Sequence, residues 1–118
     1  MAILQGTIIS GSLGRTSDSI SISSNTASID FSSNDNFVVA ASGSYKFDWT
    51  VVADNIGQSG NIIINNVSQS VVDTLPTETK TPDGAVILFV TSSATTSVLS
   101  YYVAATDKVL VSYIGNFA

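Results

Sequence analysis

The stretch Tyr45-Lys-Phe-Asp-Trp-Thr-Val51 decides the fold class of this chain. Its apolar residues, at positions 45, 47, 49 and 51, alternate with polar ones, which is the period of a β-strand with one buried and one solvated face. Shorter alternating runs precede it around Ile20 and Ile29. No window of useful length repeats apolar residues at helical spacing. We therefore expect an all-β protein.

Further apolar runs and turn residues extend this pattern along the chain. The runs Ile62–Ile64, Ala85–Val90 and Val109–Ile114 are apolar at nearly every position, which is typical of central strands with both faces covered. The Ala-Ser-Gly-Ser stretch at 41–44 predicts a hairpin into the Tyr45 strand, and Asp107-Lys108 predicts another between Val98–Ala104 and the last run. Short strands at this spacing indicate an antiparallel, jelly-roll-like β-sandwich of about eight to ten strands.

The chain divides into an N-terminal strand or arm, residues 1–17, and a β-sandwich domain, residues 18–118. Ala2–Ile9 is a short apolar run, and the polar, glycine-containing stretch GSLGRTSDS follows it. It predicts either an edge strand with a loop or an arm that pairs with the sheet edge of a neighbouring molecule. Within the domain, prolines at 76 and 82 bracket the one long stretch without strand character, about 73–84.

The composition excludes several kinds of function. The 118 residues form one domain's worth of chain, with no Cys, no His and only 11% charged residues. Thiol nucleophiles, zinc-thiolate sites and Ser-His-Asp triads cannot be built. The four basic residues are far apart and the net charge is -5, which argues against a nucleic-acid partner, and no apolar run has the roughly 20 residues of a membrane span. We expect a protein that is not an enzyme and has no cofactor or metal.

Carboxylates offer only weak candidate sites. Asp73, Glu78 and Asp83 could be considered for Ca²⁺, but their spacing is irregular and a solvated loop is the simpler interpretation. Asp30 and Asp48 could form a pair for glycoside chemistry, yet both occupy the polar positions of alternating strands and so should face solvent. The GQSG sequence at 57–60 lacks the lysine and helix of a phosphate loop, so we interpret it as a turn.

The aromatic residues favour a core and an interface over a sugar-binding platform. Tyr45, Trp49 and Tyr113 are expected in the core. Tyr101 and Tyr102 are adjacent, so in a strand they point to opposite faces and one of them lies on an outer face or an interface. Strands that are apolar on both faces would likewise leave surface for a partner.

Four segments resemble a family of small phage structural domains: GQSGNIII (57–64), AVILFV (85–90), VLSYYV (98–103) and KVLVSYIGNF (108–117). The resemblance covers about 20–117, and GQSG and LSYYV are its most specific parts. The loop departs from the family's aromatic W-x-x-P-G-G stretch and reads LPTETKTPDGA, which puts loop-specific contacts in doubt. The resemblance implies a virion component, either a capsid decoration protein or a tail-fibre or tail-associated module.

We expect a capsid decoration (cement) protein on the outer capsid surface of the virion. It would act as a homotrimer that binds the major capsid protein and clamps adjacent capsid subunits, with no nucleic-acid or membrane partner. We expect one small domain, since a fibre shaft would add repeats. The alternatives are a tail-fibre or receptor-binding module of the phage tail and a secreted carbohydrate-binding sandwich. The candidate interface residues are Ala2, Ile3, Leu4, Ile8, Ile9, Tyr101, Tyr102, Leu110 and Phe117.

Overall fold

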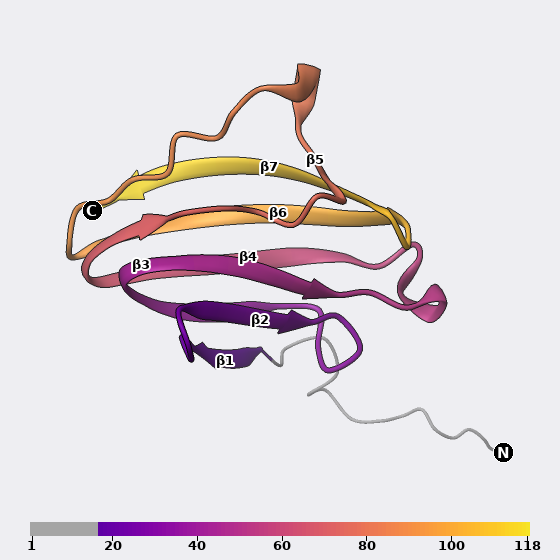
Figure 1. Ribbon diagram of the computed structural model, residues 1–118, viewed down its shortest axis with the longest axis horizontal. Helices are drawn as coiled ribbons and strands as arrows, with labels where there is room; N and C mark the ends of the chain where they lie inside the picture. Colours follow the sequence, from indigo (N-terminus) through magenta and orange to yellow (C-terminus); the bar gives the residue numbers. More distant parts are fainter. Residues whose placement is uncertain (1–16) are drawn as a thin grey trace, which may run out of the picture.

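The computed structural model describes residues 17–118, whose elements are shown in Figure 1. Nearly all the regular structure is β-strand, which confirms the predicted all-β class. Within the described range, no helix is long and apolar enough to cross a membrane. The strands are β1 (Asp18–Ser21), β2 (Thr26–Asp30), β3 (Phe37–Thr50), β4 (Ser59–Val72), β5 (Thr79–Lys80), β6 (Thr95–Ala105) and β7 (Lys108–Phe117), with short 3-10 turns η2 (Ala53–Asn55) and η3 (Pro82–Gly84).

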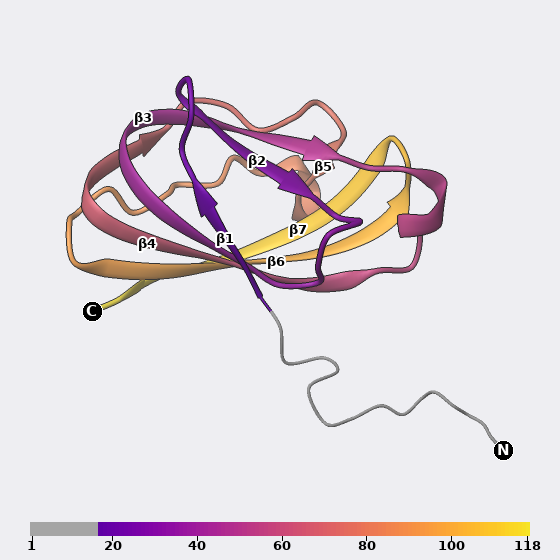
Figure 2. The same ribbon diagram turned by 90° about the horizontal axis from the view of Figure 1, so that it is seen from below.

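The strands form two layers because the two longest strands, β3 and β4, bend and contribute to both (Figure 2). Phe37–Ala40 of β3 pairs with β1, whereas Lys46–Thr50 of the same strand pairs with β2. The first layer contains β1, the first halves of β3 and β4, β6 and β7. The second layer contains β2, the second half of β3, the end of β4 and the segment 73–91, which joins it through hydrogen bonds to β3.

The pairing is antiparallel only in part of the molecule. The β4–β6 and β6–β7 pairs are antiparallel, as expected, but β1 and β2 both run parallel to β3, and β3 runs parallel to β4. The pair β1 and β2, then β3, then β4 each run from the first layer into the second. The loops 31–36 and 51–58 return the chain to the first layer, where the next strand starts beside the previous one. Each new strand therefore follows the direction of the last one. The period-2 pattern contains no information on direction, because it is the same in parallel and antiparallel strands.

Two local predictions are corrected by the structure. The expected hairpin at 41–44 is instead a bend within the single strand β3, where Gly43 has φ +67° and the register with β4 shifts between Ala41 and Gly43. The run Ala85–Val90 forms no strand: the Val90 N–H donates to the Tyr113 hydroxyl and the Phe89 ring packs on that of Tyr113, but the backbone of the run does not pair with the backbone of β7. Merging two expected strands and losing a third leaves seven strands in residues 17–118, and the expected strand Ala2–Ile9 lies outside the described residues.

The core lies between the layers and is rich in aromatic rings. Tyr45, Phe47 and Trp49 are buried, as the alternation predicted, and the rings of Phe47 and Trp49 are 5.3 Å apart. Phe31 joins the two layers, since its ring lies 5.8 Å from Trp49 and 4.6 Å from Tyr101. Each such side chain contributes about 1.5–3 kcal/mol when it is fully buried, so these rings are a main source of stability.

A buried polar cluster holds the bend of β4. Asn66 is 3% exposed, and its Nδ2 donates to the carbonyl oxygen of Val90 at 2.9 Å. Its Oδ1 accepts a hydrogen bond from the Ser70 hydroxyl at 2.7 Å, across the residues where β4 turns into the second layer. The backbone adds two bonds, from Ala94 N–H to the Asn66 carbonyl oxygen and from Ser70 N–H to that of Thr91. The cluster thus ties the bend to the segment that precedes β6.

Candidate interaction surfaces

We call the side of the first layer that faces away from the core the outer face. The rows of side chains that cross the middle of this face contain no charged residue. Its middle row crosses four strands, where the register places Val38 beside Ile63, Ile63 beside Val98, and Val98 beside Ile114. Ile114 is 65% exposed, and the other three are partly exposed. A continuous β-branched row on the solvent side of a sheet is a feature of surfaces that bind a partner.

Amide and hydroxyl side chains flank this apolar row on both sides. The Ser100 hydroxyl donates to Asn61 Oδ1 at 2.7 Å, and the Thr96 hydroxyl donates to Asn65 Oδ1 at 2.9 Å. These cross-strand bonds hold the side chains in a fixed arrangement, and the Asn61 and Asn65 amide groups keep further hydrogen-bonding capacity. The outer face can therefore be covered by a partner without removing any charge from water.

Three of the predicted interface residues are at this face. Tyr102, Leu110 and Phe117 are 47%, 42% and 54% exposed. Tyr102 and Leu110 are register partners, and Phe117 lies opposite Thr96. These three side chains therefore extend the apolar part of the outer face, Tyr102 and Leu110 toward one end of the β6–β7 pair and Phe117 toward the other. The predicted interface residues Ala2, Ile3, Leu4, Ile8 and Ile9 lie outside the described residues.

Tyr101 does not belong to the interface and is corrected to the core. It is only 4% exposed, because it points inward where its neighbour Tyr102 points outward. Its hydroxyl donates to the Asp35 carbonyl oxygen at 2.6 Å and accepts from Gln58 Nε2 at 3.0 Å. Burial raises the pKa of Tyr101, the Gln58 hydrogen bond lowers it, and the Asp35 charge raises it. Tyr101 thus connects the loops 31–36 and 51–58 that return the chain to the first layer.

The outward edge of β7 is open beyond its first residues. β5 pairs with Val109 and Leu110, but no other strand of residues 17–118 pairs with β7 on that side. The segment 85–90 runs beside this edge in Figure 1, and Val90 N–H donates to the Tyr113 hydroxyl at 2.9 Å. Between them lies a groove of about 340 Å³, lined by Thr81, Pro82, Ala85–Leu88 and Val111–Tyr113. Sequence analysis missed this edge; the apolar run 85–90 after Pro82-Asp83-Gly84 was the only signal for it.

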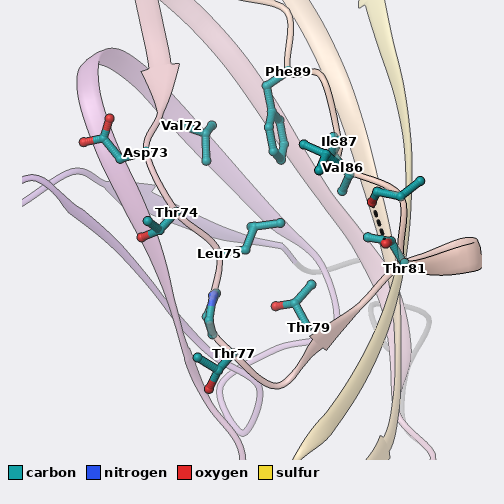
Figure 3. A pocket seen from close by; sticks show the side chains of 13 residues that line it. Val72, Asp73, Thr74, Leu75, Thr77, Thr79, Thr81, Val86, Ile87 and Phe89 are labelled. Atoms are coloured by element: carbon teal, nitrogen blue, oxygen red, sulfur yellow. Dashed lines mark hydrogen bonds between the residues drawn. The ribbon is translucent and has the colours of Figure 1, made fainter.

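A second cavity, of about 380 Å³, lies under the segment 73–91, where Leu75 and Phe89 border it (Figure 3). Thr81 closes one end by donating its hydroxyl to the Ala85 carbonyl oxygen at 2.6 Å. Among the residues that line it, Asp73 is the only one with an ionisable side chain. General acid–base chemistry by two side chains is therefore not available there.

A polar groove lies between the loops 31–36 and 51–58. Asp35 and Asp54 are exposed at its rim, and Asn55 and Gln58 line its wall. The amides hold the loops together, because Asn55 Oδ1 accepts from Val52 N–H at 2.8 Å and Gln58 Nε2 donates to the Asn34 carbonyl oxygen at 2.9 Å. The groove thus presents hydrogen-bonding groups on a fixed frame.

The remaining predicted sites are dispersed over the surface. Asp30 and Asp48 are exposed, as the alternation of their strands predicted. Asp73, Glu78 and Asp83 do not come together, and no group of three His, Cys, Asp or Glu side chains in the described range could hold a metal ion. In the GQSG segment, Gly57 is in a turn with φ +94°, and Gly60 has entered β4.

Gly60 packs directly against the loop 31–36. A Cβ atom at this position would lie 1.9 Å from the Asp35 carbonyl oxygen and 3.0 Å from the Tyr101 hydroxyl. Only a residue without a side chain allows the loop to come this close to β4. This glycine is therefore required by the same contact that Tyr101 makes.

Tyr45 has the one buried side-chain polar atom in residues 17–118 without a hydrogen-bond partner, its hydroxyl oxygen. Burial raises the pKa of this hydroxyl well above its usual range, and the nearby Tyr113 raises it further. The ring belongs to the core, so the hydroxyl is a cost of burial and supplies no chemistry.

Comparison of the chain with protein-family models, curated proteins and solved structures gave no match.

Proposed function

We propose that this chain is a non-enzymatic structural protein of a phage virion, a capsid decoration protein that binds the outer surface of the shell as a homotrimer. The observation that carries the proposal is the outer face, with its four-strand apolar row and the hydrogen-bonded Asn, Ser and Thr side chains beside it. Such a surface suits a stable, permanent contact, because it can be covered without desolvating a charge.

The proposed mechanism is multivalent clamping of adjacent capsid subunits. Each protomer places its outer face on the major capsid protein, and the trimer links three such contacts. The second and third contacts then form within one complex, which raises the overall affinity by about 10² to 10⁴ without new interactions. The acidic excess of the chain, -5 overall, suits the outside of the shell, away from packaged DNA.

The proposal is tested by shell binding of two exposed-site variants. Tyr102→Lys places a charge on the outer face, where the native ring is 47% exposed. We expect it to weaken binding to shells that lack the protein by about tenfold or more, which corresponds to roughly 1.4 kcal/mol. Ile56→Lys is the matched control, because Ile56 is 52% exposed in the turn after η2. Equal binding by both variants would refute the use of the outer face.

A tail-fibre or receptor-binding module is the second candidate, and the polar groove between the loops 31–36 and 51–58 favours it. Its carboxylates and amides are groups that hydrogen-bond sugar hydroxyls, and glycans are common receptors on cell surfaces. The copy number in purified particles separates the two functions. Hundreds of copies by quantitative mass spectrometry would support decoration, whereas a few to some tens would support the tail.

A further inference from the structure

The open edge of β7 combines three features of a strand-accepting site. Its backbone groups are the first. Val109 donates its N–H to the Glu78 carbonyl oxygen at 2.9 Å, on the side away from β6. Because backbone groups alternate sides along a strand, Tyr113 directs its N–H and C=O groups to that same side, before the register irregularity that follows Ile114. No backbone group of residues 17–118 pairs with them there.

The second feature is a strand-forming segment that has no strand partner. Residues 85–90 are β-branched or aromatic at most positions, but no ladder of hydrogen bonds includes them. Val86 and Leu88 are each 85% exposed, the highest values among the large apolar side chains of the described residues. Apolar side chains this exposed beside a free strand edge are typical of a surface that is covered in an assembly.

The third feature is the absence of charge. Every residue that lines the groove between β7 and the segment 85–90 is uncharged. A strand that entered it would meet apolar side chains on one side and free backbone groups on the other. The occupant must therefore be an uncharged segment that can supply backbone hydrogen bonds.

We propose that this edge accepts residues 2–9 of a second copy of the chain as an added β-strand. The segment Ala-Ile-Leu-Gln-Gly-Thr-Ile-Ile has no charged residue. In a strand, Ala2, Leu4 and Ile8 would share one face with Gly6, which suits the apolar groove. Ile3, Gln5, Thr7 and Ile9 would share the other face, which has the same mixture of apolar and polar residues as the outer face beside it.

The sheet order favours a second copy over the chain's own N-terminus. β1, which follows the N-terminal segment, and β7 are at opposite sides of the first layer. The distance between them is about 19 Å at about 4.8 Å per strand spacing. A neighbouring copy placed edge to edge brings its β1 side next to the β7 edge of the first copy. The neighbour's eight residues 10–17, which extend at most about 27 Å, then connect its β1 to the strand added at that edge. In the same copy they would have to cross the outer face.

The geometry is head-to-tail when each copy donates its strand to the next copy and accepts one from a different copy, instead of exchanging strands with a single partner. Head-to-tail contacts close into rings when the rotation between copies is suitable, and a threefold ring is the smallest that has no twofold contact. The inference rests on the proposed homotrimer and names its contact. It can nevertheless be tested on the purified chain without any virion, so its failure and that of the shell-binding proposal are distinguishable.

The test uses one acceptor variant and one donor variant. Leu88→Lys places a charge in the groove at a side chain that is already 85% exposed, so the monomer should fold normally. A variant that lacks residues 1–9 keeps the groove and loses the strand. By light scattering or native mass spectrometry, we expect three times the 12.3 kDa monomer mass for the native chain and the monomer mass for each variant alone. An equimolar mixture should form 1:1 heterodimers, because one variant donates and the other accepts.

The control is Val67→Lys, at a 66% exposed side chain of the β4 bend that does not line the groove, and it should remain trimeric. Disulfide trapping gives a second readout, because the native chain has no cysteine. Leu4→Cys with Leu88→Cys should crosslink between copies under oxidised glutathione, and Leu4→Cys with Val67→Cys should not. A monomeric native chain, a trimer that persists without residues 1–9, or a crosslink confined to single copies would each overturn the proposal.

Discussion

Replacement of Asn66 by alanine should destabilise the protein far more than the same change at its neighbour Asn65. Asn66 is buried, and its side chain makes two short hydrogen bonds, to the Val90 carbonyl oxygen at 2.9 Å and from the Ser70 hydroxyl at 2.7 Å. It makes longer contacts of 3.2 Å to Ser92 and Thr95. Alanine leaves these buried groups without a partner at the point where β4 passes between the layers.

The expected loss follows from these bonds. Two hydrogen bonds of about 1 kcal/mol each, with about 1 kcal/mol for a buried group left unpaired, give roughly 3 kcal/mol. With an unfolding entropy of about 2.1 cal/mol/K per residue over about 100 residues, this lowers the Tm by about 14 °C. The assay is thermal and urea unfolding followed by far-UV circular dichroism.

Asn65→Ala is the matched control, because Asn65 is partly exposed on the outer face and makes one bond, from Thr96 at 2.9 Å. We expect it to lose at most about 1 kcal/mol. If both variants unfold at the same temperature, Asn66 does not hold the bend, and the assignment of the buried polar cluster is refuted.

The other predictions concern the buried tyrosines and Gly60. Tyr45→Phe removes a hydroxyl that has no partner, so at pH 7 it should change the free energy of unfolding by less than about 0.5 kcal/mol or increase it. Tyr101→Phe should lower the free energy of unfolding by about 1–2 kcal/mol, because the Tyr101 hydroxyl makes two hydrogen bonds. Equal losses in urea titrations would contradict this contrast. Burial raises the pKa of Tyr45 in the folded state above its unfolded value of about 10. The contribution of this shift to the free energy of unfolding is fully present below about pH 10 and is lost as the pH rises above that value. Unfolding of the native chain should therefore become easier above about pH 10, and Tyr45→Phe should weaken that dependence. Gly60→Ala should lower the Tm more than Gly43→Ala. A Cβ at Gly60 would meet the Asp35 carbonyl oxygen at 1.9 Å, whereas a Cβ at Gly43 would meet nothing within 4 Å. The reverse order would show that the positive φ of Gly43, which is strained for alanine, costs more than the contact at Gly60.

Alternation along the sequence was sufficient for predicting strands and core at several positions. The period-2 pattern placed Tyr45, Phe47 and Trp49 in the core, and the structure buries all three. The same reasoning predicted that Tyr101 and Tyr102 point to opposite faces, as they do. It could not say which of them points outward, because both are large aromatic residues and either would fill a core position.

Other features depended on contacts between distant residues. The 41–44 stretch has the residues of a hairpin turn, but pairing of β3 with β1, β2 and β4 makes it a bend within one strand. The run Ala85–Val90 has the composition of a strand, but the one hydrogen bond from its backbone to β7 goes to the side-chain hydroxyl of Tyr113 and not to the backbone, so no strand pairing results. Similarly, no local signal marks Asn66 as the residue that ties β4 to the segment before β6.

The sequence by itself determined that this chain is built of strands, that the alternating residues Tyr45, Phe47 and Trp49 face its core, and that thiol, imidazole and triad chemistry are excluded. These properties follow from composition and from the period of neighbouring residues, which are local. Only the tertiary structure decided the direction of the strands, the uncharged outer face and the open edge of β7. Each of these depends on which strands become neighbours, and the register that joins Val38, Ile63, Val98 and Ile114 into one row exists only after the chain has folded.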